Sequence, residues 1–234
     1  MRTALLDLDG TLVDSAALIT THLSAALAGI GVPRTPQSLL PLVGPPFETA
    51  LPALGLTPEQ TVTVIDAYRA TYDAVAATET PLYPGTVELL ERLTAAGLRL
   101  AVATSKPERV ARRIVDGVAV AGFFALVGGA DQPGGRLGKA AVVGSVLERL
   151  GIDPARDPVV MVGDRHHDVD GAGVFGIPTV AVAWGYAHPG ELAGAAKIVA
   201  DVDELVDALT GDAHWSAPDP RVTRRGSGPS RSCG

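Results

Sequence analysis

The sequence places carboxylates at two points where an apolar segment ends. Asp7 and Asp9 follow the first apolar segment, and side chains two residues apart in an extended chain share one face. Asp164 follows a later apolar segment. Carboxylates gathered at one place are costly unless a cation neutralises them, and oxygen ligands without histidine or cysteine favour Mg²⁺. We therefore expect a magnesium site that includes Asp7, Asp9 and Asp164.

A hydroxyl group and a lysine occupy two further positions of the same kind. Thr104 and Ser105 follow another apolar segment, and Lys139 stands at the start of a predicted helix. A threonine hydroxyl donates a hydrogen bond to phosphate, and a lysine neutralises phosphate as a point charge. Together with a magnesium site, this pattern is typical of phosphoryl transfer.

These polar residues need a scaffold that brings distant loops together, and the chain offers short apolar segments separated by helical patterns. The predicted strands are Thr3–Leu8, Leu98–Ala103, Phe124–Val127, Val159–Val162, Thr179–Ala183 and a sixth at Ile198–Ala200. Strands that are apolar along their whole length indicate a parallel sheet with helices on both faces, so the fold class is doubly wound α/β. Ligands bind beyond the carboxyl ends of such strands, which is where the polar residues fall.

Helical patterns at Val87–Ala96 and Lys139–Leu150 each have an apolar face and end at a glycine. The alternation of strand and helix breaks between residues 15 and 81, where Ala16–Ala28 and Pro58–Ala77 are helical and no strand is predicted. We expect a core of residues 1–14 and 82–210, a helical cap of residues 15–81 inserted into it, and a tail of residues 211–234.

Composition excludes several classes of protein. The chain has 234 residues and a formal charge of −7, from 19 basic and 26 acidic residues, so a nucleic-acid polymer is not an expected partner. No apolar segment is long enough to span a bilayer, and acidic residues interrupt the N-terminal apolar segment, so we expect a cytoplasmic protein without a membrane contact. Residues 215–234 are rich in Ser, Pro, Gly and Arg, which favours a disordered tail. The sequence does not specify the oligomeric state, and we expect a monomer or a weak dimer.

The order of these motifs resembles that of the haloacid dehalogenase-like phosphohydrolases. The resemblance rests on Asp7-Leu8-Asp9-Gly10-Thr11, followed by Thr104, Lys139 and Gly163-Asp164, and it covers about residues 3–210. It is closest to the phosphoglycolate phosphatase and 5′-nucleotidase-like branch, since Gly44-Pro45-Pro46-Phe47 and Gly163-Asp164-Arg165 are similar to that branch.

The resemblance implies a role for each site residue. Asp7 would be the nucleophile that forms an aspartyl-phosphate, and Asp9 the acid and then the base. Asp7, the backbone carbonyl of Asp9 and Asp164 would hold Mg²⁺. Asp168 would support the metal through water or orient Lys139. Thr104, the neighbouring Ser105 amide and Lys139 would hold the phosphoryl oxygens, and the cap would act as a lid.

The resemblance does not specify the substrate. The expected activity is hydrolysis of a small phosphorylated metabolite, with 2-phosphoglycolate and a nucleoside 5′-monophosphate as nearly equal candidates. A lysine that would form an imine is absent from residues 15–81, which disfavours a phosphonate-cleaving relative. Two alternatives stay open: a sugar-phosphate mutase of the β-phosphoglucomutase type, and a phosphate-binding module without catalysis. Arg34 and Arg69 are candidates for a substrate contact or for ion pairs with Asp66 or Asp73.

Several neighbouring residues have simpler interpretations. Asp14 and Ser15 are typical caps for the first helix of the cap. His166 and His167 match no ligand position of the family and are expected in a loop. For Lys106, a surface position and a functional one are equally compatible with the sequence.

Overall fold

The computed structural model describes residues 1–131 and 135–211. Within them lies one parallel sheet, in the order β3-β2-β1-β4-β5-β6. Its strands are β1 (Thr3–Leu6), β2 (Arg99–Pro107), β3 (Phe124–Ala130), β4 (Val159–Gly163), β5 (Thr179–Val182) and β6 (Lys197–Val199). All neighbouring strands are parallel. The predicted doubly wound α/β class is therefore confirmed.

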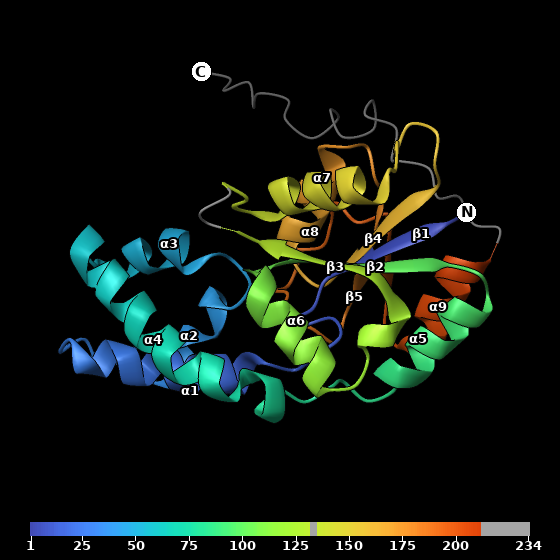
Figure 1. Ribbon diagram of the computed structural model, residues 1–234. Helices are drawn as coiled ribbons and strands as arrows, with labels where there is room; N and C mark the ends of the chain where they lie inside the picture. The colour runs from blue at the N-terminus through green and yellow to red at the C-terminus, as the bar shows by residue number, and fades with distance from the viewer. Residues whose placement is uncertain (132–134, 212–234) are drawn as a thin grey trace, which may run out of the picture.

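Helices cover both faces of this sheet (Figure 1). On one face, α7 (Lys139–Leu150) packs on β2 and β3, and α8 (His166–Gly173) packs on β4 and β5. On the other face lie α5 (Thr86–Ala95), α6 (Glu108–Gly117) and α9 (Val202–Thr210), with the short η3 (Ala121–Phe123) before β3.

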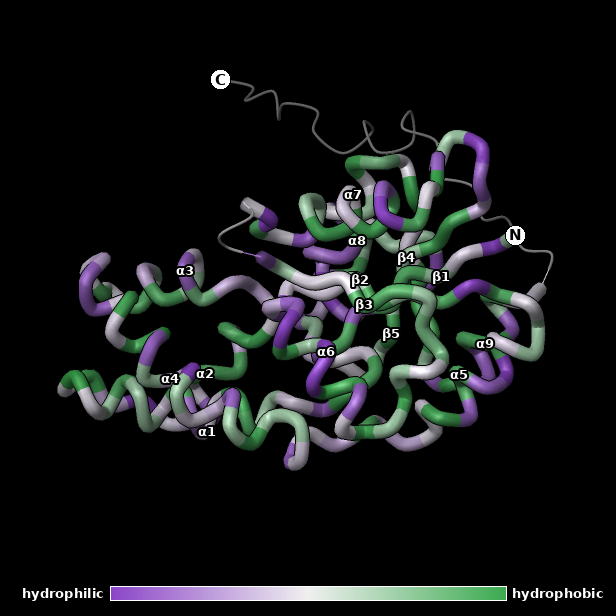
Figure 2. Tube along the Cα trace, viewed as in Figure 1, coloured by the Kyte–Doolittle hydropathy of each residue, from purple (hydrophilic) through white to green (hydrophobic). Residues whose placement is uncertain are grey.

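The two central strands, β1 and β4, are buried on both sides because every side chain in them is apolar or small. In β1, Leu5 belongs to the cluster under α7, whereas Ala4 and Leu6 belong to the cluster on the opposite face. Successive side chains of a strand point to opposite faces, so an uninterrupted apolar run supplies two cores at once. Figure 2 shows hydrophobic residues concentrated along the strands in the middle of the sheet.

Between β1 and α5 the described chain is helical. The elements are α1 (Ala16–Gly29), α2 (Pro36–Leu39), η1 (Leu40–Leu42), α3 (Phe47–Ala50), η2 (Leu51–Leu54) and α4 (Pro58–Glu79). We call residues 16–79 the cap segment; α1 packs against α4, and both lie beside the sheet rather than on it (Figure 1). At its base the two connections to the sheet run antiparallel, since Val13 pairs with Leu82. The exact domain boundaries stay a prediction.

Local structure differs from the sequence-based expectation at several places. Strand β1 ends at Leu6 rather than Leu8, and β3 continues to Ala130. Strand β2 continues through Thr104 to Pro107, because its pairing with β3 resumes at Ala130 after an irregularity. Ser15 stands at the start of α1, but its hydroxyl makes no cap hydrogen bond. His166 and His167 begin α8 instead of lying in a loop.

Two further expectations concern the C-terminal tail and a membrane contact. The predicted tail was residues 211–234, and all of it except Gly211 lies outside the described residues. None of the helices that the structure describes combines the length and the apolar character that a membrane span requires.

Candidate active site at the carboxyl ends of β1, β2 and β4

Asp7 directly follows β1 and is held by its neighbours. Its backbone N–H donates to the carbonyl of Val162, 2.9 Å away, which extends the pairing of β1 with β4 by one residue. The N–H of Leu8 donates to Asp7 Oδ1 at 2.8 Å. The residue is 8% exposed, so its carboxylate depends on protein partners rather than on bulk water.

Lys139, at the start of α7, is the cationic partner of this carboxylate. Its ammonium lies 2.8 Å from Asp7 Oδ1 and 2.7 Å from Asp168 Oδ1, and it donates to the carbonyl of Ala103 at 3.0 Å. Burial alone would lower the pKa of Lys139, but the carboxylates of Asp168 and Asp7 outweigh it and raise that pKa. Lys139 therefore stays charged and fixes the orientation of both aspartates.

Three carboxylates gather here against this one ammonium. Asp7, Asp164 and Asp168 are buried, and one carboxylate oxygen of each lies within 4.8 Å of the others. Burial raises the pKa of Asp164 well above its ordinary value, and the charges of Asp168 and Asp7 raise it further. Burial likewise raises the pKa of Asp7, against the opposing effect of Lys139. The excess negative charge suits a divalent cation with oxygen ligands.

Glycines leave room around Asp164. A Cβ atom on Gly10, whose φ is +81°, would lie 2.1 Å from Asp164 Oδ2. A Cβ atom on Gly185, in the loop after β5, would lie 2.3 Å from Asp164 Cβ and 2.5 Å from the carbonyl oxygen of Gly10. A side chain at either position would displace the Asp164 carboxylate. Glycine at both positions therefore allows the backbone to lie directly against Asp164.

Asp168 has a second partner besides Lys139. Its Oδ2 accepts from the N–H of Arg165 at 3.1 Å, at the start of α8. The residue is fully buried. Asp168 therefore orients Lys139 and caps α8, and it also contributes a carboxylate to the cluster with Asp7 and Asp164.

The side chain of Asp9 points away from the carboxylates of Asp7, Asp164 and Asp168. Its Oδ1 accepts a hydrogen bond of 2.5 Å from the hydroxyl of Ser15, and its Oδ2 lies 3.1 Å from the ammonium of Lys106. Its side chain is therefore separate from the group formed by Asp7, Asp164 and Asp168, and it lines a cavity between the cap segment and the sheet. The use of the Asp9 backbone carbonyl toward a metal stays a prediction.

Thr104 and Ser105 lie in the last residues of β2. Thr104 is buried, and its hydroxyl accepts from the N–H of Lys106 at 3.2 Å. Ser105 lines the cavity. Lys106 is buried as well, with its ammonium 2.9 Å from the hydroxyl of Tyr72 on α4. Burial alone would lower the pKa of Lys106, but the charge of Asp9 outweighs it and the pKa is raised well above its ordinary value.

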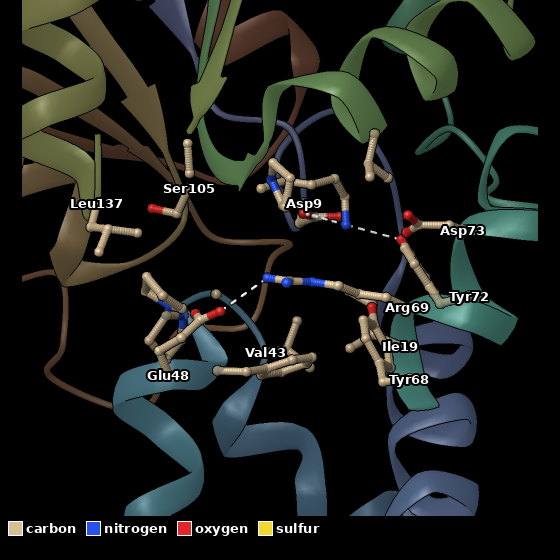
Figure 3. Close-up of a pocket in the computed structure, with 18 of the residues that line it drawn as sticks. Asp9, Ile19, Val43, Glu48, Tyr68, Arg69, Tyr72, Asp73, Ser105 and Leu137 are labelled. Carbon is tan, nitrogen blue, oxygen red and sulfur yellow. Dashed lines mark hydrogen bonds and ion pairs between the residues drawn. The ribbon is translucent and has the colours of Figure 1, made fainter. Parts of the chain in front are cut away.

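The cavity next to Asp9 has a volume of about 260 Å³. One side is aromatic: Tyr68 and Tyr72 stack at 4.9 Å with an interplanar angle of 16°, and Phe47 meets Tyr68 edge-on. Figure 3 shows the Arg69 side chain extending from α4 between Asp9 and Val43 toward Glu48, and the ion pair of Arg69 with Glu48 measures 3.0 Å. Arg69 thus pairs with Glu48, and Asp73 pairs with Arg109.

Two functional candidates were missed by sequence reasoning. The N–H of Tyr186 donates to Asp164 Oδ2 at 2.7 Å, and its hydroxyl donates to Asp14 and accepts from the N–H of Ala16. The segment Trp184-Gly185-Tyr186 follows β5, so the rule that ligands bind at strand ends pointed to it without specifying a role.

Arg165 was also missed as a structural link. It pairs with Glu191 at 2.6 Å and donates to the carbonyl of Val43 in the cap segment at 2.5 Å. Its guanidinium is buried and thereby connects the loop after β4 to the cap segment.

Comparisons with known proteins agree with this geometry. The family described as haloacid dehalogenase-like hydrolase matches residues 4–182. A tyrosine-protein kinase PtkA of Mycobacterium tuberculosis is 43% identical over 208 residues, which cover 87% of this chain and 70% of that protein. A phosphoglycolate phosphatase of Caulobacter vibrioides is 35% identical (82% and 84% covered), and a 5′-nucleotidase of Pseudomonas aeruginosa is 32% identical (80% and 85% covered). The crystal structure of a predicted phosphatase from Clostridium acetobutylicum superposes with a TM-score of 0.84 at 34% identity, covering 89% of this chain and 97% of that one.

Proposed function

Because this chain belongs to the haloacid dehalogenase-like hydrolases and is a phosphoric monoester hydrolase, we propose that it releases phosphate from a small metabolite through an aspartyl-phosphate on Asp7, with Mg²⁺ as cofactor. The observation that carries this proposal is the division of the aspartates. Asp7 pairs with Lys139 and lies in the cluster of buried carboxylates. Asp9 instead lines the cavity in which a leaving group would lie.

In the first step an oxygen of Asp7 bonds to phosphorus and the bond to the ester oxygen breaks, while Asp9 gives its proton to that oxygen. In the second step Asp9 takes a proton from water, the water oxygen bonds to phosphorus, and the Asp7–phosphorus bond breaks. The sum is ester plus water to alcohol plus phosphate. Lys139 holds Asp7 in place throughout, and Thr104, the Ser105 amide and Lys139 are the proposed partners of the phosphoryl oxygens.

The residues present fit the proposed cation. Three carboxylates are buried together, and Lys139 pairs with only two of them, Asp7 and Asp168. Gly10 and Gly185 allow the backbone to lie directly against the third, Asp164. Asp7, Asp164 and the carbonyl of Asp9 would hold Mg²⁺, with Asp168 in support. When bound, Mg²⁺ neutralises charge that develops on the phosphoryl oxygens.

The cavity favours one of the two predicted substrates. Its described lining contains three basic side chains, and each pairs with an acidic one from the same lining: Lys106 with Asp9, Arg69 with Glu48 and Arg109 with Asp73. The carboxylate of phosphoglycolate would have to compete with these acids. A nucleoside is uncharged, and the aromatic side of the cavity suits a planar ring, so we infer a preference for a nucleoside 5′-monophosphate.

The test is phosphate release from phosphoglycolate, nucleoside monophosphates, sugar phosphates and p-nitrophenyl phosphate, with and without Mg²⁺. We expect activity that requires Mg²⁺ and falls by several powers of ten in Asp7→Asn, because an amide is a poor nucleophile and a poor metal ligand. Near-normal turnover by Asp7→Asn would exclude the proposed intermediate. Magnesium binding without turnover of any ester would favour a non-catalytic module instead.

Transfer to an acceptor other than water is the second candidate, because the relative with 43% identity is named a kinase and a mutase uses the same phosphoaspartate. The ratio of phosphate to alcohol released from one ester distinguishes the two. Hydrolysis gives a ratio of one. A ratio below one after addition of a tyrosine peptide, or of β-glucose 1-phosphate with a bisphosphate primer, would show transfer.

A further inference from the structure

Lys106 is a buried cation to which the proposed mechanism gives no task. Its side chain is 6% exposed, although it belongs to the last residues of β2, next to the cavity. Removing an ammonium from water is costly, so a lysine in this position needs compensating partners.

Its partners come from two different parts of the molecule. The ammonium lies 3.1 Å from Asp9 Oδ2 and 2.9 Å from the hydroxyl of Tyr72, and 4.8 Å from the centre of the Tyr72 ring. Asp9 follows β1, whereas Tyr72 lies on α4 of the cap segment and is itself 1% exposed. Lys106 thus joins the acid of the active site to the cap segment through two short contacts.

The two oxygens of Asp9 are held by different groups. Ser15 donates to Oδ1 from the start of the cap segment, and Lys106 holds Oδ2 from β2. A general acid must lie within about 3 Å of the oxygen that it protonates, so the direction of this carboxylate decides whether the proton reaches the leaving group.

We propose that Lys106 is a positioning residue: it directs the Asp9 carboxylate toward the leaving group and makes that direction depend on the seating of α4 through Tyr72. The inference rests on the proposed function, because it assigns the partner of the proposed acid. This role differs from direct binding of the substrate by Lys106. Loss of a positioning residue impairs proton transfer, whereas loss of a substrate-binding cation raises KM.

The first experiment measures kcat/KM of Lys106→Met for two esters. An alkyl phosphate needs a proton on its leaving oxygen, whereas p-nitrophenyl phosphate releases a stable anion and needs little help. We expect kcat/KM to fall about 100-fold for the alkyl ester and less than about tenfold for p-nitrophenyl phosphate, because general acid catalysis contributes about 10²–10⁴-fold. Lys197→Met, at an exposed lysine of β6, is the matched control and should change neither value.

Two results of that experiment would overturn the proposal. Equal losses for both esters would show that Lys106 has no particular connection with leaving-group protonation. A higher KM confined to phosphoglycolate, with kcat unchanged, would show that Lys106 binds the substrate carboxylate directly. Absence of Mg²⁺-dependent phosphate release in the unmodified protein would instead reject the proposed function itself.

The second experiment keeps the proposal testable if Lys106→Met folds poorly. Tyr72→Phe removes the hydroxyl and keeps the ring, and we expect it to lower kcat/KM for the alkyl ester about threefold to tenfold, again more than for p-nitrophenyl phosphate. The comparison of the two esters by Tyr72→Phe alone does not depend on the folding of Lys106→Met. Where Lys106→Met does fold, adding Tyr72→Phe to it should cause no further loss, because residues that act through one contact are not additive. Independent, multiplying losses, or no effect of Tyr72→Phe alone, would contradict the connection to the cap segment.

Discussion

Close packing around Asp164 shows how individual residues set the chemistry of this site. Gly185 approaches Asp164 so closely that an added Cβ atom would lie 2.3 Å from the Cβ of the aspartate. The neighbouring N–H of Tyr186 donates to the same carboxylate at 2.7 Å. The carboxylate is therefore oriented by a backbone N–H, and a side chain at position 185 would collide with it.

Gly185→Ala should weaken the binding of Mg²⁺ without removing any ligand. The added methyl group displaces Asp164, and changes in the groups that orient metal ligands typically cost 10–100-fold in affinity. A Mg²⁺ titration of phosphate release should show a half-saturating concentration about 10–100-fold higher. Gly173→Ala, at a position of α8 where a Cβ atom meets nothing within 4 Å, is the control. Equal affinity in Gly185→Ala and the native protein would contradict this account of Asp164.

Sequence reasoning at the residue scale worked where the position of a residue at the end of a strand or the start of a helix already indicates the site. Lys139 was identified because it stands at a helix start among acidic loops, and the structure brings it to Asp7 and Asp168. Lys106 was left open because its burial depends on Tyr72, which lies far away in the sequence. Ser15 was expected to cap α1, but its hydroxyl bonds to Asp9, a partner that local preferences do not include.

At the scale of elements, Glu108 connects three parts of the α/β layer. The residue begins α6, and it pairs with Arg112 of the same helix, with Arg149 of α7 and with Arg136 from the segment after β3. Burial alone would raise the pKa of Glu108, but hydrogen bonds from Arg149 and Arg112 lower it to about 2. The folded protein therefore stabilises the ionised carboxylate.

The contribution of Glu108 to stability should depend on pH. It is fully present above the ordinary carboxyl pKa near 4.5 and is lost as the pH falls toward about 2, because the unfolded chain takes up the proton first. Glu108→Gln should cost about 1 kcal/mol at pH 7, a fall in Tm of about 2–4 °C, with a difference that shrinks in acid. Thermal unfolding at several pH values, with Glu148→Gln at an exposed position of α7 as control, measures this. A difference that persists unchanged at low pH would contradict it.

Among the elements, helices with a regular apolar pattern could be predicted from the sequence. The lengthening of a strand by pairing with its neighbour could not. The predicted helix Lys139–Leu150 has the observed bounds, because its apolar stripe indicates the buried face and Gly151 indicates its end. Strand β2 runs four residues beyond its apolar segment, because β3 supplies partners for Thr104 and Pro107 that no local pattern encodes. The four-residue helices α2 and α3 carry too few turns for a periodic signal.

For the whole molecule, the cap segment and the sheet meet through polar contacts that surround the cavity. Arg165 reaches the carbonyl of Val43, and Lys106 reaches Tyr72. Tyr186 joins the segment that leads into α1 to the loop that holds Asp164. The active-site aspartates are thus embedded in the contacts that hold the two parts together, so the state of the site and the stability of the whole should be coupled.

Magnesium should therefore stabilise the entire fold. Lys139 pairs with only two of the three buried carboxylates, and burial raises the pKa values of Asp7 and Asp164, so their charges are costly without a further cation. A ligand that binds only the folded state stabilises by about 2.7 kcal/mol at 100 times its Kd, which corresponds to a rise in Tm of about 5–10 °C at this size.

The substitution Asp164→Asn separates this effect from a general response to salt. The variant should show no rise in Tm with Mg²⁺, and in chelator its Tm should equal or exceed that of the native protein, because one of the crowded charges is gone. Asp170→Asn, at an exposed position of α8, should keep the full shift. Thermal unfolding in chelator and in Mg²⁺ measures all three proteins, and a shift in Asp164→Asn as large as the native one would place the cation elsewhere in the molecule.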